Sequence, residues 1–333
     1  MKKYNIAVLG ATGAVGREMI KILEERAFPV NELRCLASAK SVGKKLGFCS
    51  GEVTVREADE GAFAGIDIVL GAVESEYAKR FAPHIKAAGA VFVDNSSAFR
   101  MQDDVPLVIP EINGDDALKH SGIIANPNCS TIIAMMAVKP IDDISPITSM
   151  VVSTYQAVSG AGAGGIAELE SQNRALVSGG ELKVSQFQHQ IAYNLIPHIG
   201  GFGDNGYTSE EMKMQNEGRR IMHLPELTVS CTCVRVPVLR SHSISIALKT
   251  RERVEVAQAR RAIAAFAGCR LMDEPDKNMY PMPLDTSDQD LVYVGRLRRD
   301  LTDEAHGLTL WCCGDQIRKG AATNAVQIAE LLI

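Results

Sequence analysis

One cysteine of this chain, Cys129, stands where a thiol could act as a nucleophile. It lies in the run NPNCST at 126–131, directly before the apolar stretch Ile132 to Val138. The pattern predicts a helix that begins at or near Cys129, with Ser130 and Thr131 available to satisfy free backbone amides. A helix N-terminus stabilises a thiolate, and its N–H groups can bind the oxyanion of a tetrahedral intermediate. Most free cysteines are small buried residues, but Cys129 begins its apolar run between polar neighbours, so we expect a reactive thiol.

A glycine-rich turn near the N-terminus has the spacing of a dinucleotide-binding loop. The segment GATGAVG at 10–16 follows the apolar run Tyr4 to Leu9 and precedes a helical pattern from Gly16 to Leu23. Backbone N–H groups in such a turn, together with the positive end of the helix, can hold a pyrophosphate. The strand before and the helix after favour this function over a plain glycine turn. The candidate contacts are Gly10, Thr12, Gly13, Ala14 and Val15.

The segment after the second predicted strand bears on the choice of cofactor. That strand, Leu33 to Ala37, runs into SAKSVGKK at 38–45, whereas an NAD site usually has an acidic residue there for the ribose hydroxyls. Hydroxyl and ammonium groups at Ser38, Lys40 and Ser41 suit a 2′-phosphate. They favour NADP over NAD, with an ordinary solvated basic loop as the alternative.

Composition sets the class of protein. A length of 333 residues suggests two domains, and 46% hydrophobic with 23% charged residues is typical of a globular protein. A net charge of -5 gives no bulk attraction to nucleic acid or to an anionic membrane. Without a signal peptide or spanning segment we expect a cytoplasmic location and reduced thiols. The pairs Cys231 with Cys233 and Cys312 with Cys313 lack CxxC partners, so we expect buried thiols and no metal site.

The order of patterns predicts an α/β fold with two domains. Strand patterns at Ile66 to Ala72, Ala90 to Val93 and Ile123 to Ala125, with a helical stretch from Ser75 to Ala88, predict a parallel Rossmann-type sheet. Longer strands then follow at Ser149 to Ala157, Leu227 to Pro237 and Ser243 to Lys249, which indicates an α+β domain. A helical pattern from Ala321 to Leu332 predicts a helix that returns to the first domain. We therefore assign residues 1–128 and 316–333 to the NADP-binding domain and 129–315 to the second domain.

Taken together, these motifs resemble the aspartate-β-semialdehyde dehydrogenase family. The matching segments span essentially the whole chain: GATGAVG at 10–16, NSSAFR at 95–100, NPNCST at 126–131, YQAVSGAG at 155–162, EEMKM at 210–214, RVPVLRSH at 235–242 and RKGAATNAVQIAE at 318–330. The resemblance implies an NADPH-dependent reductive dephosphorylation of L-aspartyl-4-phosphate to L-aspartate-4-semialdehyde, on the route to lysine, methionine and threonine. It also implies that the second domain is catalytic and forms a homodimer.

The resemblance also assigns roles to individual residues. Cys129 would carry the acyl-thioester, His242 would act as general acid and base, and Gln156 would orient the acyl group. Arg235 would bind the substrate α-carboxylate, and Glu211 the amino group, with Glu210 left open as its alternative. The expected phosphate contacts are Arg100, Asn128 and Lys213, and further cofactor contacts are Ser159, Gly160 and Gln316. The family more often has asparagine at the position of Gln316 and arginine at that of Lys40.

One local pattern conflicts with these roles. Arg235 and His242 are seven residues apart, and an odd spacing on one strand points two side chains to opposite faces. A bend or bulge at Pro237 would be needed to bring them together.

Three other functions compete. N-acetyl-γ-glutamyl-phosphate reductase shares the thioester chemistry, but its cysteine motif typically reads NPGCY rather than NPNCS. Glyceraldehyde-3-phosphate dehydrogenase has a different cysteine motif again. A non-catalytic nucleotide-binding relative would be expected to lose its site, whereas Cys129, Gln156, Arg235 and His242 are all retained.

Overall fold

The computed structural model describes residues 2–333, which divide into two compact units. The first runs to Asn128 and resumes at Ala321, and the second extends from Cys129 to Gly320. The predicted α/β fold with two domains is thus confirmed. The sequence placed the return to the first domain at Gln316 rather than at Ala321. The difference arises because Asp315 and Gln316 make their side-chain hydrogen bonds within the second unit.

The first unit is built on a parallel sheet. Its strand order is β5-β2-β1-β6-β7-β8, and every neighbouring pair is parallel. The strands are β1 (Tyr4–Leu9), β2 (Val30–Ala37), β5 (Arg56–Glu57), β6 (Ile68–Gly71), β7 (Val91–Asp94) and β8 (Ile123–Ala125). A separate antiparallel hairpin joins β3 (Lys45–Phe48) to β4 (Gly51–Thr54). The apolar runs of the sequence therefore form the central strands.

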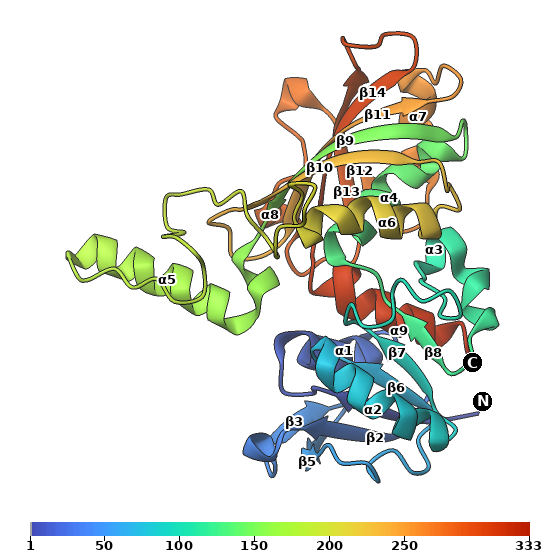
Figure 1. Ribbon diagram of the computed structural model, residues 1–333, viewed down its shortest axis with the longest axis vertical. Helices are drawn as coiled ribbons and strands as arrows, with labels where there is room; N and C mark the ends of the chain where they lie inside the picture. The colour runs from blue at the N-terminus through green and yellow to red at the C-terminus, as the bar shows by residue number, and fades with distance from the viewer. Residues whose placement is uncertain (1) are drawn as a thin grey trace. The chain divides into compact units, whose positions relative to one another are not determined.

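Helices complete the core of this unit (Figure 1). They are α1 (Ala14–Glu25), α2 (Ser75–Ala87), α3 (Pro110–Asn113) and α9 (Thr323–Glu330). The crossovers β1-α1-β2 and β6-α2-β7 run in opposite directions across the sheet, so right-handed connections put α1 and α2 on opposite faces. Met19, Ile22 and Leu23 follow helical spacing on α1 and are buried in the same apolar cluster as Val326 of α9. The C-terminal helix thus belongs to the core of the first unit, as its apolar spacing predicted.

The glycine turn follows β1 where the strand order reverses. In open parallel sheets, ligands bind at such a switch point, beyond the carboxyl ends of the strands. Gly10 has a φ of +88°, and a Cβ there would lie 2.3 Å from the carbonyl oxygen of Ala72, the residue after β6. A Cβ on Gly16 would lie 2.3 Å from the Gly10 oxygen. Only glycine at both positions lets strand, turn and helix pack this closely.

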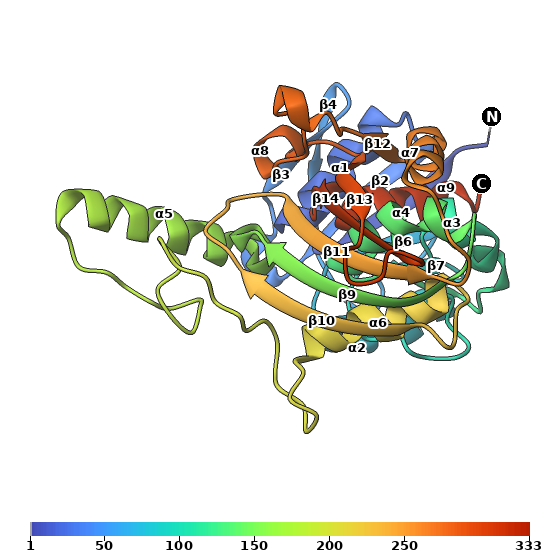
Figure 2. The same cartoon turned by 90° about the horizontal axis from the view of Figure 1, so that it is seen from above.

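The second unit has a mixed sheet with the order β10-β9-β11-β14-β13-β12. Its strands are β9 (Ile147–Gln156), β10 (Thr228–Arg235), β11 (His242–Thr250), β12 (Cys269–Leu271), β13 (Val292–Arg299) and β14 (Gly307–Gly314). Strand β9 pairs parallel with β10 and antiparallel with β11, and the three strands lie side by side in Figure 2.

One buried helix organises the core of the second unit. Helix α4 (Cys129–Asp142) contacts strands β9, β11, β13 and β14, and is flanked by α6 (Ser209–Ile221) and α7 (Val256–Ala265). Nearly all of its side chains are buried, which explains why its sequence is apolar on every face. A short helix, α8 (Pro283–Thr286), contacts β14. The buried helix therefore fixes its first residue, Cys129, relative to the sheet.

Helix α5 (Gly162–Ser178) projects away from the second sheet in both views (Figures 1 and 2). The last turn of this helix and the segment that follows it to α6 carry exposed apolar side chains, including Val177, Tyr193 and Phe202, which are 87%, 82% and 63% exposed. Apolar side chains gathered on one extended segment are typical of a protein–protein contact. Among the helices of residues 2–333, none combines the length and apolar character needed to cross a lipid bilayer.

We predict that Gly10→Ala destabilises the protein more than Gly43→Ala. Both glycines have positive φ, but a Cβ on Gly43 would meet no atom within 4 Å. Gly43→Ala should therefore lower the free energy of unfolding by about 1 kcal/mol, which is the cost to alanine of adopting the left-handed backbone conformation. The contact with Ala72 should add roughly 1 to 3 kcal/mol for Gly10→Ala. Urea titration of both variants measures the difference, and equal losses would show that the turn tolerates a side chain.

Candidate active site

Three polar side chains gather at one edge of the second sheet because strands begin or end there. Gln156 ends β9 and Arg235 ends the parallel strand β10, and the two are paired in register. His242 begins β11, which pairs with the other side of β9, so that Ser243 faces Tyr155. Arg235 and His242 therefore lie on different strands, joined by the connection 236–241. The rule for odd spacing on one strand therefore does not apply to them. Of the two expected alternatives, a bulge is not needed, whereas the chain does bend at Pro237 within the connection.

Cys129 reaches this edge from α4. Its Sγ lies 3.4 Å from Nε2 of His242, within hydrogen-bonding distance for sulfur. Cys129 is the first residue of the helix, as predicted from its position before the apolar run, and the structure shows that it is half-buried. The second residue of the helix, Ser130, accepts a 2.7 Å hydrogen bond from Nε2 of Gln156. The helix N-terminus is thus tied directly to the end of β9.

The hydrogen bonding of His242 determines which ring nitrogen holds its proton. The imidazole is fully buried, and its Nδ1 accepts the backbone N–H of Ala157 at 3.1 Å. A nitrogen that accepts cannot carry a proton, so the neutral ring is protonated on Nε2 and donates toward Sγ of Cys129. Burial, reinforced by the charge of Arg235 and opposed by Glu210, lowers the pKa of His242 to about 3. The ring is therefore neutral at physiological pH.

Arg235 supplies a buried positive charge beside the pair. It is 7% exposed, and one of its Nη atoms donates to the carbonyl of Ala157 at 2.7 Å. Burial lowers the pKa of Arg235, and the negative charges of Cys129 and Glu210 act in the opposite direction. A Cβ on Gly160 would lie 2.9 Å from Nη1 of Arg235 and 3.2 Å from the His242 ring. Gly160 thus leaves room for both side chains.

The two neighbouring glutamates of α6 have different environments. Glu211 forms a capping box with Thr208, and its other carboxylate oxygen accepts the backbone N–H of Cys233 at 3.0 Å. Glu210 instead accepts hydrogen bonds from Nε2 of Gln156 at 3.3 Å and from Nζ of Lys213 at 2.8 Å. Glu211 therefore holds the start of the helix against β10, whereas Glu210 faces the active-site residues. The geometry favours Glu210 over Glu211 as the acid of the site.

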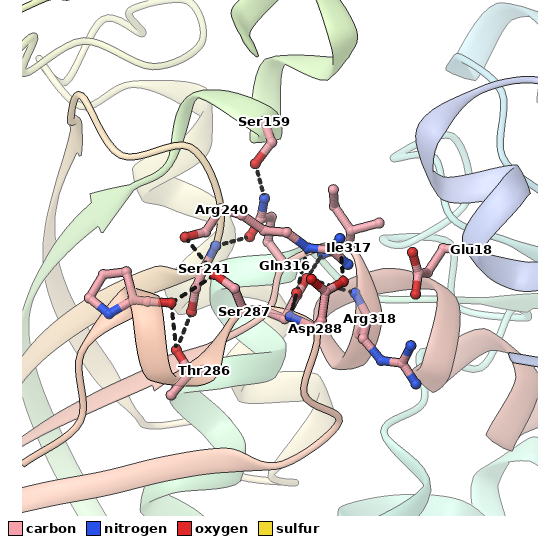
Figure 3. Close-up of polar contacts among 12 residues, drawn as sticks. Glu18, Ser159, Arg240, Ser241, Thr286, Ser287, Asp288, Gln316, Ile317 and Arg318 are labelled. Atoms are coloured by element: carbon pink, nitrogen blue, oxygen red, sulfur yellow. Dashed lines mark hydrogen bonds and ion pairs between the residues drawn. The ribbon is translucent and has the colours of Figure 1, made fainter. Parts of the chain in front are cut away.

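Gln316 and Ser159 form a hydrogen-bonded chain that leads to the residue before His242 (Figure 3). The side-chain amide of Gln316 donates to the hydroxyl of Ser159 and accepts the backbone N–H of Ser241 at 2.8 Å. Both residues are nearly fully buried. The resemblance assigned them to the cofactor, and nothing in the sequence pattern indicated the contact with Ser241.

Two groups of predicted residues lie in the first unit. Arg100 is 7% exposed and donates to the carbonyls of Asn126 and Asn95 at 2.9 and 2.7 Å, and Asn128 is also buried. Beside the glycine turn, the hydroxyls of Thr12 and Ser41 are 3.4 Å apart, and Ser38 and Lys40 are exposed.

Lys44 joins this second group, with its Nζ 3.5 Å from the Ser41 hydroxyl. It stood in the basic segment 38–45 but was not singled out from the sequence. Two hydroxyls and an ammonium group close to the Gly10 turn are suited to bind a phosphate. Helix α1 begins at Ala14, directly after Gly13, and no side chain within residues 2–333 caps it, so its first backbone N–H groups are suited to bind a pyrophosphate.

Comparison with known proteins relates both units to one family. Residues 5–120 match the family described as semialdehyde dehydrogenase, NAD binding domain, and residues 138–319 match semialdehyde dehydrogenase, dimerisation domain. An aspartate-semialdehyde dehydrogenase of Aquifex aeolicus is 50% identical, over 99% of this chain and 98% of its own length. One from Synechocystis is 48% identical, over 98% and 97%.

A solved structure of similar fold covers the whole chain. It is the crystal structure of aspartate semialdehyde dehydrogenase II of Vibrio cholerae complexed with ASA, with a TM-score of 0.97 and 43% identity. The match covers 100% of this chain and 98% of that one. Together with the full-length relatives, it shows that this chain belongs to the aspartate-semialdehyde dehydrogenase family.

Proposed function

We propose that the chain reduces L-aspartyl-4-phosphate to L-aspartate-4-semialdehyde with NADPH and releases phosphate, through a thioester on Cys129. The observation that carries this proposal is the 3.4 Å approach of Sγ of Cys129 to His242 at a sheet edge that also holds Arg235. The reaction needs a nucleophile, a hydrogen-bond donor for oxyanions and a partner for the substrate carboxylate. These residues supply all three.

In the first step, the Cys129 thiolate attacks the acyl carbon of the substrate. The C–S bond forms, the bond from the acyl carbon to the phosphate oxygen breaks, and inorganic phosphate leaves with the electron pair. The helix N-terminus, the Arg235 charge and Nε2–H of His242 all stabilise the thiolate before the attack. A neutral imidazole protonated on Nε2 suits this step, because it donates a hydrogen bond to the sulfur and leaves the negative charge on the thiolate.

A nicotinamide dinucleotide, held at the glycine turn before α1, would supply the hydride that reduces the thioester carbon in the second half of the reaction. Nε2–H of His242 donates to the resulting oxyanion and stabilises it. When the carbonyl re-forms, the C–S bond breaks and Cys129 leaves as the thiolate with which the cycle began. In the reverse direction the same donor polarises the aldehyde for attack by sulfur.

The two ends of the substrate need opposite charges. A planar guanidinium is the apt bidentate partner for the α-carboxylate, which supports Arg235 in this role. For the amino group we propose Glu210 in place of Glu211, because the Glu211 carboxylate is already bonded to two backbone N–H groups. Gln156 is proposed to orient the acyl group. For the phosphate we retain Arg100, Asn128 and Lys213.

The choice of NADP rests on the first unit. A nicotinamide dinucleotide is expected from the NAD binding domain of the family, and the N-terminus of α1 after Gly13 is suited to hold its pyrophosphate. Ser38, Lys40 and Ser41, with Lys44, favour a ribose that carries a 2′-phosphate.

A homodimer, formed through the second unit, is supported by the dimerisation domain of the family and by the exposed apolar side chains after α5. The role in lysine, methionine and threonine biosynthesis follows from the proposed product. A cytoplasmic location stays a prediction.

We expect Cys129→Ala to abolish the reaction. Incubation with aspartate semialdehyde, phosphate and NADP reports the reverse reaction as NADPH absorbance, and loss of the nucleophile should lower kcat by about 10⁴-fold or more. NADP affinity, measured by fluorescence titration, should stay nearly unchanged because NADP binding does not require an acyl group on Cys129. Parallel reactions with NAD, and with N-acetylglutamate semialdehyde, separate the cofactor and substrate classes. Undiminished turnover by Cys129→Ala would exclude the thioester.

Glu210→Gln and Glu211→Gln should have different effects. Loss of the Glu210 charge removes a charge-assisted contact with the substrate, so kcat/KM for aspartate semialdehyde should fall about ten-fold or more. Glu211→Gln weakens the helix cap, so it should lower the free energy of unfolding by about 1 kcal/mol with a smaller effect on kcat/KM. Steady-state kinetics and urea titration of both variants test the assignment. The opposite pattern would restore Glu211 as the substrate ligand.

The low pKa of His242 predicts how stability depends on pH. The ordinary pKa is 6.5 and the folded value is about 3, so between these pH values the unfolded chain binds a proton that the folded chain does not. Stability is therefore lost as pH falls from 6.5 toward 3, by up to about 1.4 kcal/mol per pH unit. Urea titrations between pH 4 and pH 7 should show a shallower slope for His242→Asn. The exposed His306, changed to Asn, is the control, and equal slopes in all three proteins would contradict the burial of a neutral ring.

A further inference from the structure

Asp315 and Gln316 follow the last residue of β14 and precede a π-helical turn, Arg318–Ala322. Asp315 is fully buried and Gln316 is 3% exposed, although both are polar. Buried polar side chains are costly unless they are hydrogen-bonded. The partners of these two side chains therefore indicate what the segment does.

Gln316 holds the residue directly before His242. Ser241 has a φ of +73°, a left-handed backbone conformation that residues other than glycine rarely adopt. Its backbone N–H donates to Oε1 of Gln316, and its hydroxyl is hydrogen-bonded to that of Thr286 (Figure 3). Nε2 of Gln316 donates in turn to Ser159. A strained residue persists only when its surroundings hold it, so these contacts set the direction in which His242 enters β11.

Asp315 holds Arg240, the residue before Ser241 in the same connection. One carboxylate oxygen accepts Nε of Arg240 at 2.6 Å and the backbone N–H of Asp288 at 2.7 Å. The other accepts two backbone N–H groups of the following turn, those of Ile317 and Arg318, at 2.8 and 3.0 Å. The carboxylate thus joins the connection that leads to His242 to the start of the π-helical turn.

The same turn packs against the nucleophile. The backbone N–H of Gly320 donates to the carbonyl oxygen of Asp315 at 2.9 Å. A Cβ on Gly320 would lie 3.0 Å from the Cβ of Cys129, closer than nearly all real Cβ contacts. The backbone of the turn therefore limits where Cys129 can lie.

We propose that Asp315 and Gln316 are positioning residues that set the distance between Cys129 and His242. They act on His242 through Arg240 and Ser241, and on Cys129 through Gly320. The inference rests on the proposed role of the Cys129 and His242 pair. It differs from a role of Gln316 in binding the cofactor, because both ends of its amide are already bonded within the second unit.

Alkylation of Cys129 by iodoacetamide, without substrate or cofactor, tests this proposal. Among the cysteines, Cys49 is exposed, Cys129 is half-buried and the others are buried, so a Cys49→Ser background isolates the reaction. The rate is measured from pH 5 to pH 10 by mass spectrometry of the Cys129 peptide. Gln316→Met should lower the rate at pH 7 about ten-fold and move its profile to higher pH, because the misplaced Nε2–H no longer stabilises the thiolate.

Steady-state kinetics of the same variant should show a similar fall in kcat, with KM for NADP changed less than about two-fold. Ser159→Ala removes only the hydroxyl that accepts the hydrogen bond of the Gln316 amide. It should also lower the alkylation rate and kcat, but by less than Gln316→Met. It serves as the second probe should Gln316→Met fail to fold. Gln215→Met is the matched control, because Gln215 also accepts a backbone N–H, that of Val229 at 3.0 Å, in the same unit. Its alkylation profile should match that of the background.

Two results would overturn the proposal. Alkylation that is unchanged in both Gln316→Met and Ser159→Ala, with KM for NADP raised, would make Gln316 a cofactor contact. An equal loss of alkylation rate in Gln215→Met would make the effect a general one of altered stability. Failure of the proposed function would be seen differently. The unaltered protein would then show no phosphate-dependent reduction of NADP, while the alkylation rates of Cys129 in the variants could still be compared.

Discussion

The pairing of β9 with β10 on one side and β11 on the other is the constraint on which the active site depends. Because β10 runs parallel to β9, their carboxyl ends coincide and bring Gln156 beside Arg235. Because β11 runs antiparallel on the other side of β9, its first residue, His242, returns to the same edge. A shift of register by one residue would turn these side chains to the opposite face of the sheet. The apolar strand positions that bury the sheet against α4 thus also specify the chemistry at its edge.

The electrostatics of the site follow from this burial. Arg235 and His242 are both removed from water, and burial lowers the pKa of each. The imidazole responds by remaining neutral, with its proton directed to Cys129 by the N–H of Ala157. The guanidinium remains charged because the ordinary pKa of arginine lies far above neutrality, and its charge favours a thiolate. A neutral donor and a fixed cation around one sulfur suit a reaction whose intermediates are anions.

The sequence predicted those features that depend on local pattern. The glycine turn, the parallel strands, the helix at Cys129 and the C-terminal helix all follow from spacing within a few residues. The relation of Arg235 to His242 could not be obtained in this way, because it depends on a connection that moves the chain from one strand to another. Glu210 and Glu211 are adjacent on one helix, and only their partners in space distinguish them. The roles of Asp315 and Gln316 arise from contacts with residues about 75 positions away. The periodicity of a single helix or strand cannot predict such contacts.

The proposed mechanism depends on Cys129 carrying the acyl group. Mixing the protein with aspartate semialdehyde and NADP in the absence of phosphate, followed by acid quenching and peptide mass spectrometry, tests it most directly. The thioester cannot then be released by phosphate, so we expect about one equivalent of NADPH per active site and an aspartyl group on the Cys129 peptide. Addition of phosphate should remove that group. NADPH formed without any modification of Cys129, or with the acyl group on another residue, would contradict the account.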